Sequence, residues 1–95
     1  MKHHIIVKFN SDAPKVETML SGIKKTFEPV LEIDGITDIE IKPNIIAREN
    51  RYDLMIIITM TEAALPVYDE CDAHKKWKSE YGNFIEKKAI FDSEN

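Results

Sequence analysis

The residues of this chain best suited to acid–base chemistry on a small molecule lie close together in its last third. His74 follows Asp72-Ala73, Tyr68 lies six residues before it, and Trp77 lies three residues after it. A neutral imidazole can accept a proton at physiological pH. A tyrosine hydroxyl can hydrogen-bond a carbonyl oxygen and stabilise a developing enolate. His74 as base and Tyr68 as polariser are therefore the candidate catalytic pair.

A structural interpretation of the same residues stays open beside the catalytic one. Asp72 is the predicted N-cap of a helix, so His74 falls in the first turn, where the positive helix end favours a neutral imidazole. In the alternative, His74 caps or packs a helix junction and Tyr68 belongs to the core. Trp77 stands four residues from Ala73 and from Tyr81, a spacing more typical of a core than of a binding site, although Trp77 can also line a pocket.

Metal, cofactor and thiol chemistry find little support in the sequence. His3 and His4 are adjacent on a predicted strand and point to opposite faces, so they cannot chelate one ion together. The chain has no His-x-x-x-His, no cysteine pair and no Gly-rich phosphate loop. The single cysteine, Cys71, excludes an internal disulfide, fits a reducing compartment and is expected to be an inert packing or surface thiol. No metal and no cofactor are predicted.

Composition indicates one ordinary globular domain over residues 1–95. The chain is 43% hydrophobic and 32% charged, and its net charge of −4 argues against a nucleic-acid partner. The local cluster of Lys75, Lys76 and Lys78 is explained most simply as a solvated helix face. Ile5-Ile6-Val7 is too short for a signal peptide and no apolar run reaches the roughly 20 residues of a membrane helix, so a cytoplasmic location is expected.

The order of elements that must position these residues is predicted to be βαββαβ. Pro43 cannot donate a ladder hydrogen bond, so the second strand is expected at a sheet edge. Asp72 divides the second helical region into two pieces. The predicted elements are a strand at 2–9, a helix from about Ser11 to Pro29, strands at 36–46 and 52–60, a helical region from the cap Thr61 to Gly82, and a strand at 84–92.

Both faces of the third strand are apolar. Leu54, Ile56, Ile58 and Met60 alternate with Met55 and Ile57. Helices in so short a chain can cover only one face of the sheet, and an antiparallel sheet usually shows polar residues on an open face. A second copy of the chain is the simplest cover, which predicts a homodimer. The absence of aromatic residues at Met55 and Ile57 disfavours the RNA-binding use of this topology.

Several segments, in order along nearly the whole chain, resemble the stress-responsive A/B barrel (Dabb) family of dimeric α+β barrel proteins. The resemblance implies an α+β, ferredoxin-like βαββαβ fold with an antiparallel sheet that dimerises face to face. The matching pieces are Lys2-His3 with Phe9, Gly35 to Ile41, Arg51 to Leu54, Tyr68, Asp72-Ala73-His74 with Trp77, and Lys88 to Asp92.

The same resemblance implies roles for single residues. In the plant olivetolic acid cyclases of that family, which close a linear polyketide by aldol condensation, a pocket histidine matches His3, the catalytic histidine matches His74 and a tyrosine matches Tyr68. Leu54 replaces a further pocket histidine, so the polyketide reaction itself is not predicted. We expect a pocket bordered by His3, Leu54, Tyr68, His74 and Trp77.

Three functions remain open on the sequence alone. The first is binding of a small apolar carbonyl or aromatic compound, with possible cofactor-free, cyclase- or isomerase-like chemistry by His74 and Tyr68. The second is a cofactor-independent monooxygenase of the same fold. The third is a non-catalytic stress-related dimer.

Overall fold

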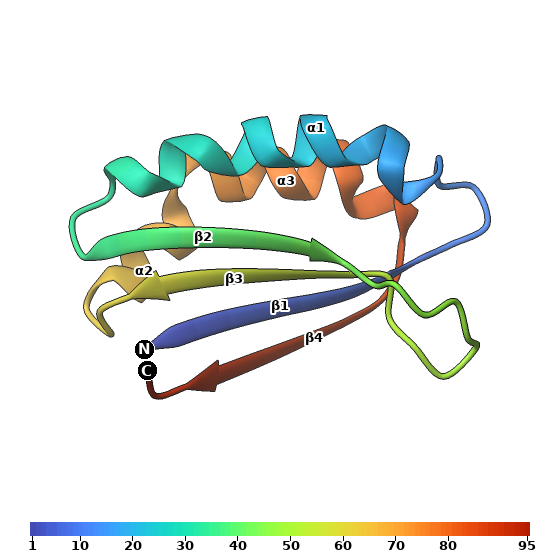
Figure 1. The fold of residues 1–95 in the computed structure, drawn as a ribbon. Coiled ribbons are helices and arrows are strands. Elements are labelled where there is room, and N and C mark those ends of the chain that lie inside the picture. The colour runs from blue at the N-terminus through green and yellow to red at the C-terminus, as the bar shows by residue number, and fades with distance from the viewer.

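All helices of the chain pack against one face of a four-stranded antiparallel sheet (Figure 1). The computed structural model describes all 95 residues, Met1–Asn95. The predicted βαββαβ order and ferredoxin-like α+β class are confirmed. The elements are β1 (Lys2–Phe9), α1 (Val16–Phe27), the short 3-10 helix η1 (Glu28–Glu32), β2 (Ile36–Pro43), β3 (Leu54–Met60), α2 (Ala64–Glu70), α3 (Asp72–Tyr81), the 3-10 turn η2 (Gly82–Phe84) and β4 (Ile85–Ser93).

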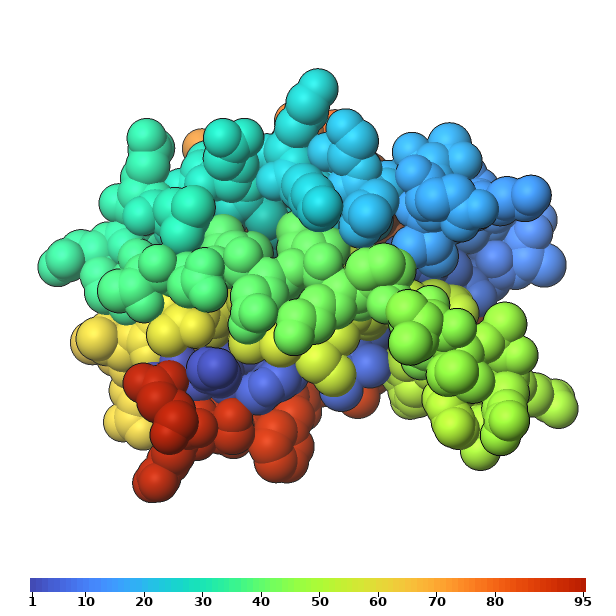
Figure 2. Space-filling model, viewed as in Figure 1, coloured from blue at the N-terminus to red at the C-terminus, as the bar shows by residue number.

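The strand order in the sheet is β2-β3-β1-β4. β2 is an edge strand, as Pro43 predicted, but the strand ends at Pro43 and does not reach residue 46. Beyond Pro43 the chain leaves the sheet as a loop, residues 44–53, which projects from one end of the molecule (Figure 2). Asn44 closes this loop because its backbone and side-chain N–H groups donate to the carbonyls of Asp53 and Tyr52.

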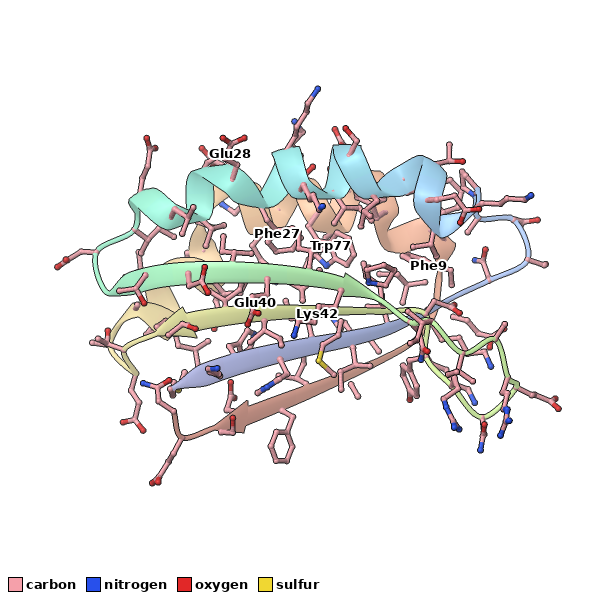
Figure 3. All side chains as sticks on the ribbon, viewed as in Figure 1. Phe9, Phe27, Glu28, Glu40, Lys42 and Trp77 are labelled. Carbon is pink, nitrogen blue, oxygen red and sulfur yellow. The ribbon has the colours of Figure 1, made fainter.

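The register of the central strand β1 fixes which residues can reach the helices. His3 is opposite Ile58 of β3 and Asp92 of β4, while Val7 is opposite Leu54. Because successive side chains alternate between faces, His3, Ile5 and Val7 all point to the helical side and are buried. Above them Phe27 of α1 and Trp77 of α3 pack with ring centroids 5.3 Å apart, between helices and sheet (Figure 3).

The junction between α2 and α3 differs from the sequence prediction in one respect. The N-cap of α3 is Cys71, not Asp72: Cys71 is extended, with φ −74° and ψ 157°, and its Sγ accepts the backbone N–H of His74 at 3.4 Å. Asp72 is instead the first helical residue, where its carboxylate still favours the positive helix end. Thr61 likewise provides no side-chain cap for α2, since only its backbone carbonyl accepts, from Ala64.

No helix lies over the second face of the sheet, which we call the uncovered face. Ile6, Met55, Ile57 and Phe91 occupy it, and Phe91 is 62% exposed. An ion pair on β2, between Lys42 and Glu40 at 3.6 Å, borders this apolar area (Figure 3).

Gly35 generates the first prediction, because it adopts a φ of 91° at the turn that starts β2. A Cβ there would collide with the Thr61 hydroxyl and lie 3.2 Å from Ala64 Cβ. Gly35→Ala should therefore destabilise the fold by about 1–3 kcal/mol. Gly82→Ala is the matched control, since Gly82 has helical φ and a Cβ added to it would meet no atom within 4 Å. Chemical denaturation of both variants measures the difference, and equal stabilities would contradict this account of the turn.

Candidate active site

A cleft of about 300 Å³ opens between the sheet and the α2–α3 pair, and it brings four of the five predicted site residues together. We call it the imidazole cleft. His3, Tyr68, His74 and Trp77 all line it. Its remaining lining residues are Ile5, Leu65, Asp69, Lys78, Lys88, Ile90 and Asp92.

Leu54, the fifth predicted residue, does not line the imidazole cleft. It is 1% exposed in the core and touches a different hollow beside the 44–53 loop. The register explains this position: Leu54 is opposite Val7, four residues along β1 from His3. At a rise of about 3.4 Å per residue, the two side chains leave the sheet about 14 Å apart.

Tyr68 lies at the centre of the cleft lining, between two imidazoles. Its ring centroid is 5.5 Å from that of His3, edge to face, and 4.8 Å from that of His74. Tyr68 is fully buried and its hydroxyl has no hydrogen-bond partner. Burial raises the pKa of this hydroxyl well above its usual range, and the nearby Cys71 and Asp69 add to the effect. The group is therefore a neutral donor that has no acceptor within the protein.

His74 presents its second ring nitrogen as a base. Its Nδ1 lies 3.0 Å from the carbonyl oxygen of Asp69. A carbonyl can only accept, so Nδ1 carries the proton, and Nε2 of the neutral ring holds the lone pair. Burial is the main cause that lowers the pKa of His74, and the positive charges of Lys78 and Lys88 lower it further; the Asp69 hydrogen bond and carboxylate partly oppose them. The ring is thus neutral at physiological pH.

His3 forms a pair with Asp92 that sequence reasoning missed. The Nδ1 of His3 donates to a carboxylate oxygen of Asp92 at 2.6 Å, and the His3 side chain is 7% exposed. The two residues are 89 positions apart and meet only through the β1–β4 register. No local pattern in the sequence marks this pair, because it depends on the register between strands at the two ends of the chain.

The structure brings no three His, Cys, Asp or Glu side chains together in an arrangement that could hold a metal ion. The imidazole cleft itself offers two imidazoles and two carboxylates. The His3 imidazole and the Asp92 carboxylate are hydrogen-bonded to each other. Proton transfer and hydrogen bonding are therefore what these side chains can perform unaided.

None of the helices combines the length and apolar character needed to span a bilayer.

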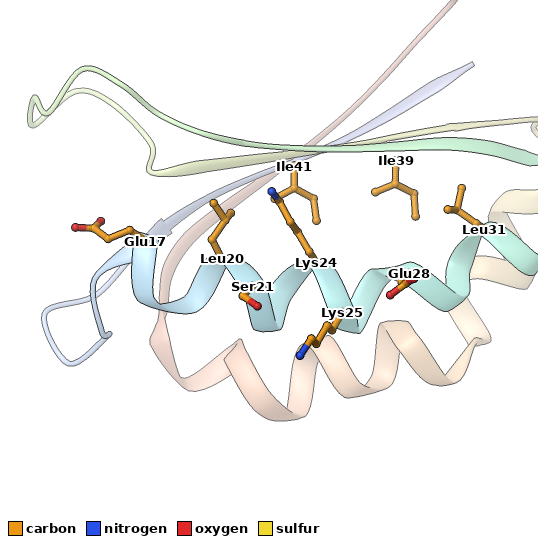
Figure 4. Close-up of a pocket in the computed structure, with 9 residues that line it drawn as sticks. All are labelled: Glu17, Leu20, Ser21, Lys24, Lys25, Glu28, Leu31, Ile39 and Ile41. Carbon is orange, nitrogen blue, oxygen red and sulfur yellow. The ribbon is translucent and has the colours of Figure 1, made fainter.

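A larger groove, of about 670 Å³, lies along the outer side of α1 and the edge strand β2 (Figure 4). Leu20, Ile39 and Ile41 line it, with Lys24 and Glu28 at its sides. It contains no histidine, tyrosine or cysteine. The groove therefore lacks the acid–base groups that the smaller imidazole cleft has.

The fold is that of a ferredoxin-like α+β protein. No family sequence model matches the chain, and no curated protein matches it either. Solved structures do match. A dimeric protein of ferredoxin-like fold from Bacteroides fragilis superposes with a TM-score of 0.79 at 17% identity, over 99% of this chain and 94% of that one.

Two further matches share the fold. A Dabb family protein with a ferredoxin-like fold from Mesorhizobium loti has a TM-score of 0.72 at 18% identity, over 99% of this chain and 94% of its own. Hydroxynitrile lyase from Passiflora edulis has a TM-score of 0.72 at 10% identity, over 95% of this chain and 87% of that one. At the level of the fold, the resemblance drawn from sequence is confirmed.

The unpartnered hydroxyl of Tyr68 generates the second prediction. A buried polar group without a partner costs about 1–3 kcal/mol, so Tyr68→Phe should leave the free energy of unfolding unchanged or raise it by about 1 kcal/mol. Most buried tyrosines behave in the opposite way, because their hydroxyl is bonded. Urea denaturation of the wild type and of Tyr68→Phe measures the difference in the free energy of unfolding and so distinguishes an unpartnered hydroxyl from a bonded one. A loss of more than about 1 kcal/mol would mean that the hydroxyl has a structural partner.

The third prediction concerns the pH dependence of His74. Its pKa is lowered in the folded state from the ordinary value of 6.5, so the unfolded chain takes up the proton at a higher pH than the folded one. Protonation therefore favours unfolding, and the contribution of His74 to stability is complete above about pH 6.5 and declines as pH falls below it. An NMR titration of the ring should place its pKa below 6.5 and show the proton on Nδ1. A pKa at or above the ordinary value, or a proton on Nε2, would contradict this assignment.

Proposed function

We propose that the imidazole cleft binds a small carbonyl compound and that His74 transfers a proton at the carbon next to the carbonyl, without a cofactor. One observation carries the proposal above all: Tyr68 holds a buried, neutral, unpartnered hydroxyl beside an imidazole whose Nε2 is free. A carbonyl oxygen is the acceptor that this hydroxyl lacks. Because Tyr68 is 0% exposed, a ligand that supplies this acceptor has to displace neighbouring side chains to reach the hydroxyl, and the new bond would relieve the penalty of the unpaired group.

The proton transfer itself needs only these two side chains. Nε2 of His74 removes a proton from the carbon, and the electron pair of that C–H bond moves into an enolate whose charge rests on the carbonyl oxygen. The Tyr68 hydroxyl donates to that oxygen and stabilises the charge. The Asp69 carbonyl accepts a hydrogen bond from Nδ1 and stabilises the imidazolium, which then returns the proton to carbon. Where the carbonyl compound also carries a C=C bond conjugated with the enolate, return of the proton to the far end of that conjugated system gives an isomer.

The rest of the lining favours a small, largely apolar compound. The cleft volume of about 300 Å³ is at the small end for ligand pockets. Ile5, Leu65 and Trp77 supply apolar walls. The His3–Asp92 bond holds the His3 ring against the edge of Tyr68, so it positions the tyrosine. The hydroxynitrile lyase among the structural matches supports the proposal, since it is an enzyme on the same fold.

The fourth prediction tests the proton transfer with phenylacetone, a neutral ketone with acidic C–H bonds. In D₂O the wild type should speed exchange of those protons for deuterium, followed by NMR. His74→Gln should reduce the protein-dependent rate by about 100-fold or more, the usual contribution of a general base, and Tyr68→Phe by about tenfold or more. Lys75→Gln, on α3 next to His74 in sequence but outside the cleft lining, is the control and should exchange as the wild type does. Equal rates in the wild type and His74→Gln would refute the proposal.

We also propose that the working form is a homodimer joined through the uncovered face. Ile6, Met55, Ile57 and Phe91 make this face apolar although no helix covers it. Two structural matches are described as dimeric proteins of ferredoxin-like fold, which supports the same arrangement here. The partners expected for the chain are thus a second copy and a small molecule; the net charge of −4 disfavours nucleic acid.

The fifth prediction is that Phe91→Glu, at a position of the uncovered face that is 62% exposed in the single chain, gives monomers or aggregates, because it would bury an unpaired carboxylate at the interface. Val67→Glu is the control: Val67 is also an apolar residue, 55% exposed, but it lies on α2, away from the uncovered face. Sedimentation velocity at micromolar concentration should show dimers for the wild type and for Val67→Glu. A monomeric wild type would contradict the dimer.

A further inference from the structure

Two lysines face the imidazole cleft without a partner. Lys78 comes from α3 and Lys88 from β4. Neither takes part in an ion pair, whereas Lys76 lies 3.9 Å from Glu80 and Lys42 pairs with Glu40. The sequence grouped Lys78 with Lys75 and Lys76 as one solvated face. The structure separates them, since only Lys78 of the three lines the cleft.

The two lysines come from two elements that border the cleft, Lys78 from α3 and Lys88 from β4. Lys78 is four residues after His74 and so lies beside it on the same face of α3. Lys88 is opposite Val7 and shares its face of β4 with Ile90 and Asp92, so its side chain leaves the sheet on the helical side. A molecule bound against His74 would therefore meet one positive charge from the helix and one from the sheet.

Two carboxylates, of Asp69 and Asp92, share the cleft with these lysines, and neither forms an ion pair with them. The carboxylate of Asp92 accepts the hydrogen bond of His3. Asp69 is exposed, and its carboxylate lies in no ion pair with either lysine. Tyr68 is neutral and so is the ring of His74. The cleft thus combines the Tyr68 hydroxyl, which has no acceptor, with two lysines that form no ion pair.

We propose that the carbonyl compound taken by the cleft also carries a carboxylate, which Lys78 and Lys88 bind while its carbonyl oxygen lies at the Tyr68 hydroxyl. The inference rests on the proposed function and names its substrate class, a small oxo acid. Ammonium–carboxylate hydrogen bonds are charge-assisted and stronger than neutral ones, so two of them orient the ligand as well as hold it. A ketone without the carboxylate would bind in the same place but more weakly.

Binding of such an anion would also change the base. Both lysines lower the pKa of His74, in addition to the larger effect of burial. A bound carboxylate offsets their positive charge, so the pKa of His74 rises when the substrate arrives. His74 then becomes a stronger base in the complex than in the free protein.

The test compares benzoylformate with benzoylformamide, its neutral amide of nearly the same shape. Binding is followed by two-dimensional NMR of the full-length protein, with the His74 ring signals as the reporter of the cleft. The acid should bind about tenfold or more tightly than the amide, and added salt should weaken the acid alone. Lys78→Gln and Lys88→Gln should each reduce the affinity for the acid about three- to tenfold and leave the amide unaffected.

Lys87→Gln and Lys75→Gln are matched controls, because Lys87 neighbours Lys88 but points to the uncovered face, and Lys75 lies on α3 outside the cleft. Both should bind the acid as the wild type does. Equal affinities of acid and amide would overturn the oxo-acid inference and leave the proposed function intact, as would unchanged acid binding in Lys78→Gln and Lys88→Gln together. If neither compound shifts the His74 signals, the oxo-acid inference and ligand binding in the cleft fall together.

Discussion

The burial of the Tyr68 ring between the sheet and the α2–α3 junction is the constraint on which the candidate site depends. The ring is fully buried and contacts His3 from the sheet on one side and His74 from α3 on the other. It gains the apolar burial that a small domain needs, yet its hydroxyl is left without a partner. The Tyr68 side chain therefore contributes both to the stability of the fold, through its ring, and to the proposed reaction, through its hydroxyl.

The break between α2 and α3 sets the tautomer that lets His74 act as a base. Cys71 leaves the helical conformation and caps α3, so the chain turns back and His74 reaches the Asp69 carbonyl. That bond fixes the proton on Nδ1 and frees Nε2. One uninterrupted helix would keep the Asp69 carbonyl in its own backbone ladder, and His74 would lose the bond that sets its tautomer.

Local patterns in the sequence were enough to predict the elements and several site residues. Alternation along β1 put His3 and His4 on opposite faces, and Pro43 marked the edge strand. The Dabb-like motifs singled out Tyr68, His74 and Trp77, which line one cleft. Register between distant strands was beyond such patterns. The Asp92 partner of His3, the turn of Lys88 into the cleft and the distance of Leu54 from it all depend on how β1 pairs with β3 and β4. The Cys71 cap was missed because Asp is a far more common cap than Cys, and Asp72 suits the first helical turn equally well.

The proposed site requires that the Tyr68 hydroxyl donates a hydrogen bond to a ligand oxygen. A crystal structure of the protein soaked with phenylacetone tests this most directly. The account predicts the ketone oxygen about 2.6–3.0 Å from Tyr68 Oη, with His74 Nε2 facing the neighbouring carbon. A hydroxyl bonded to a protein atom, or a ketone bound only in the groove between α1 and β2, would contradict it.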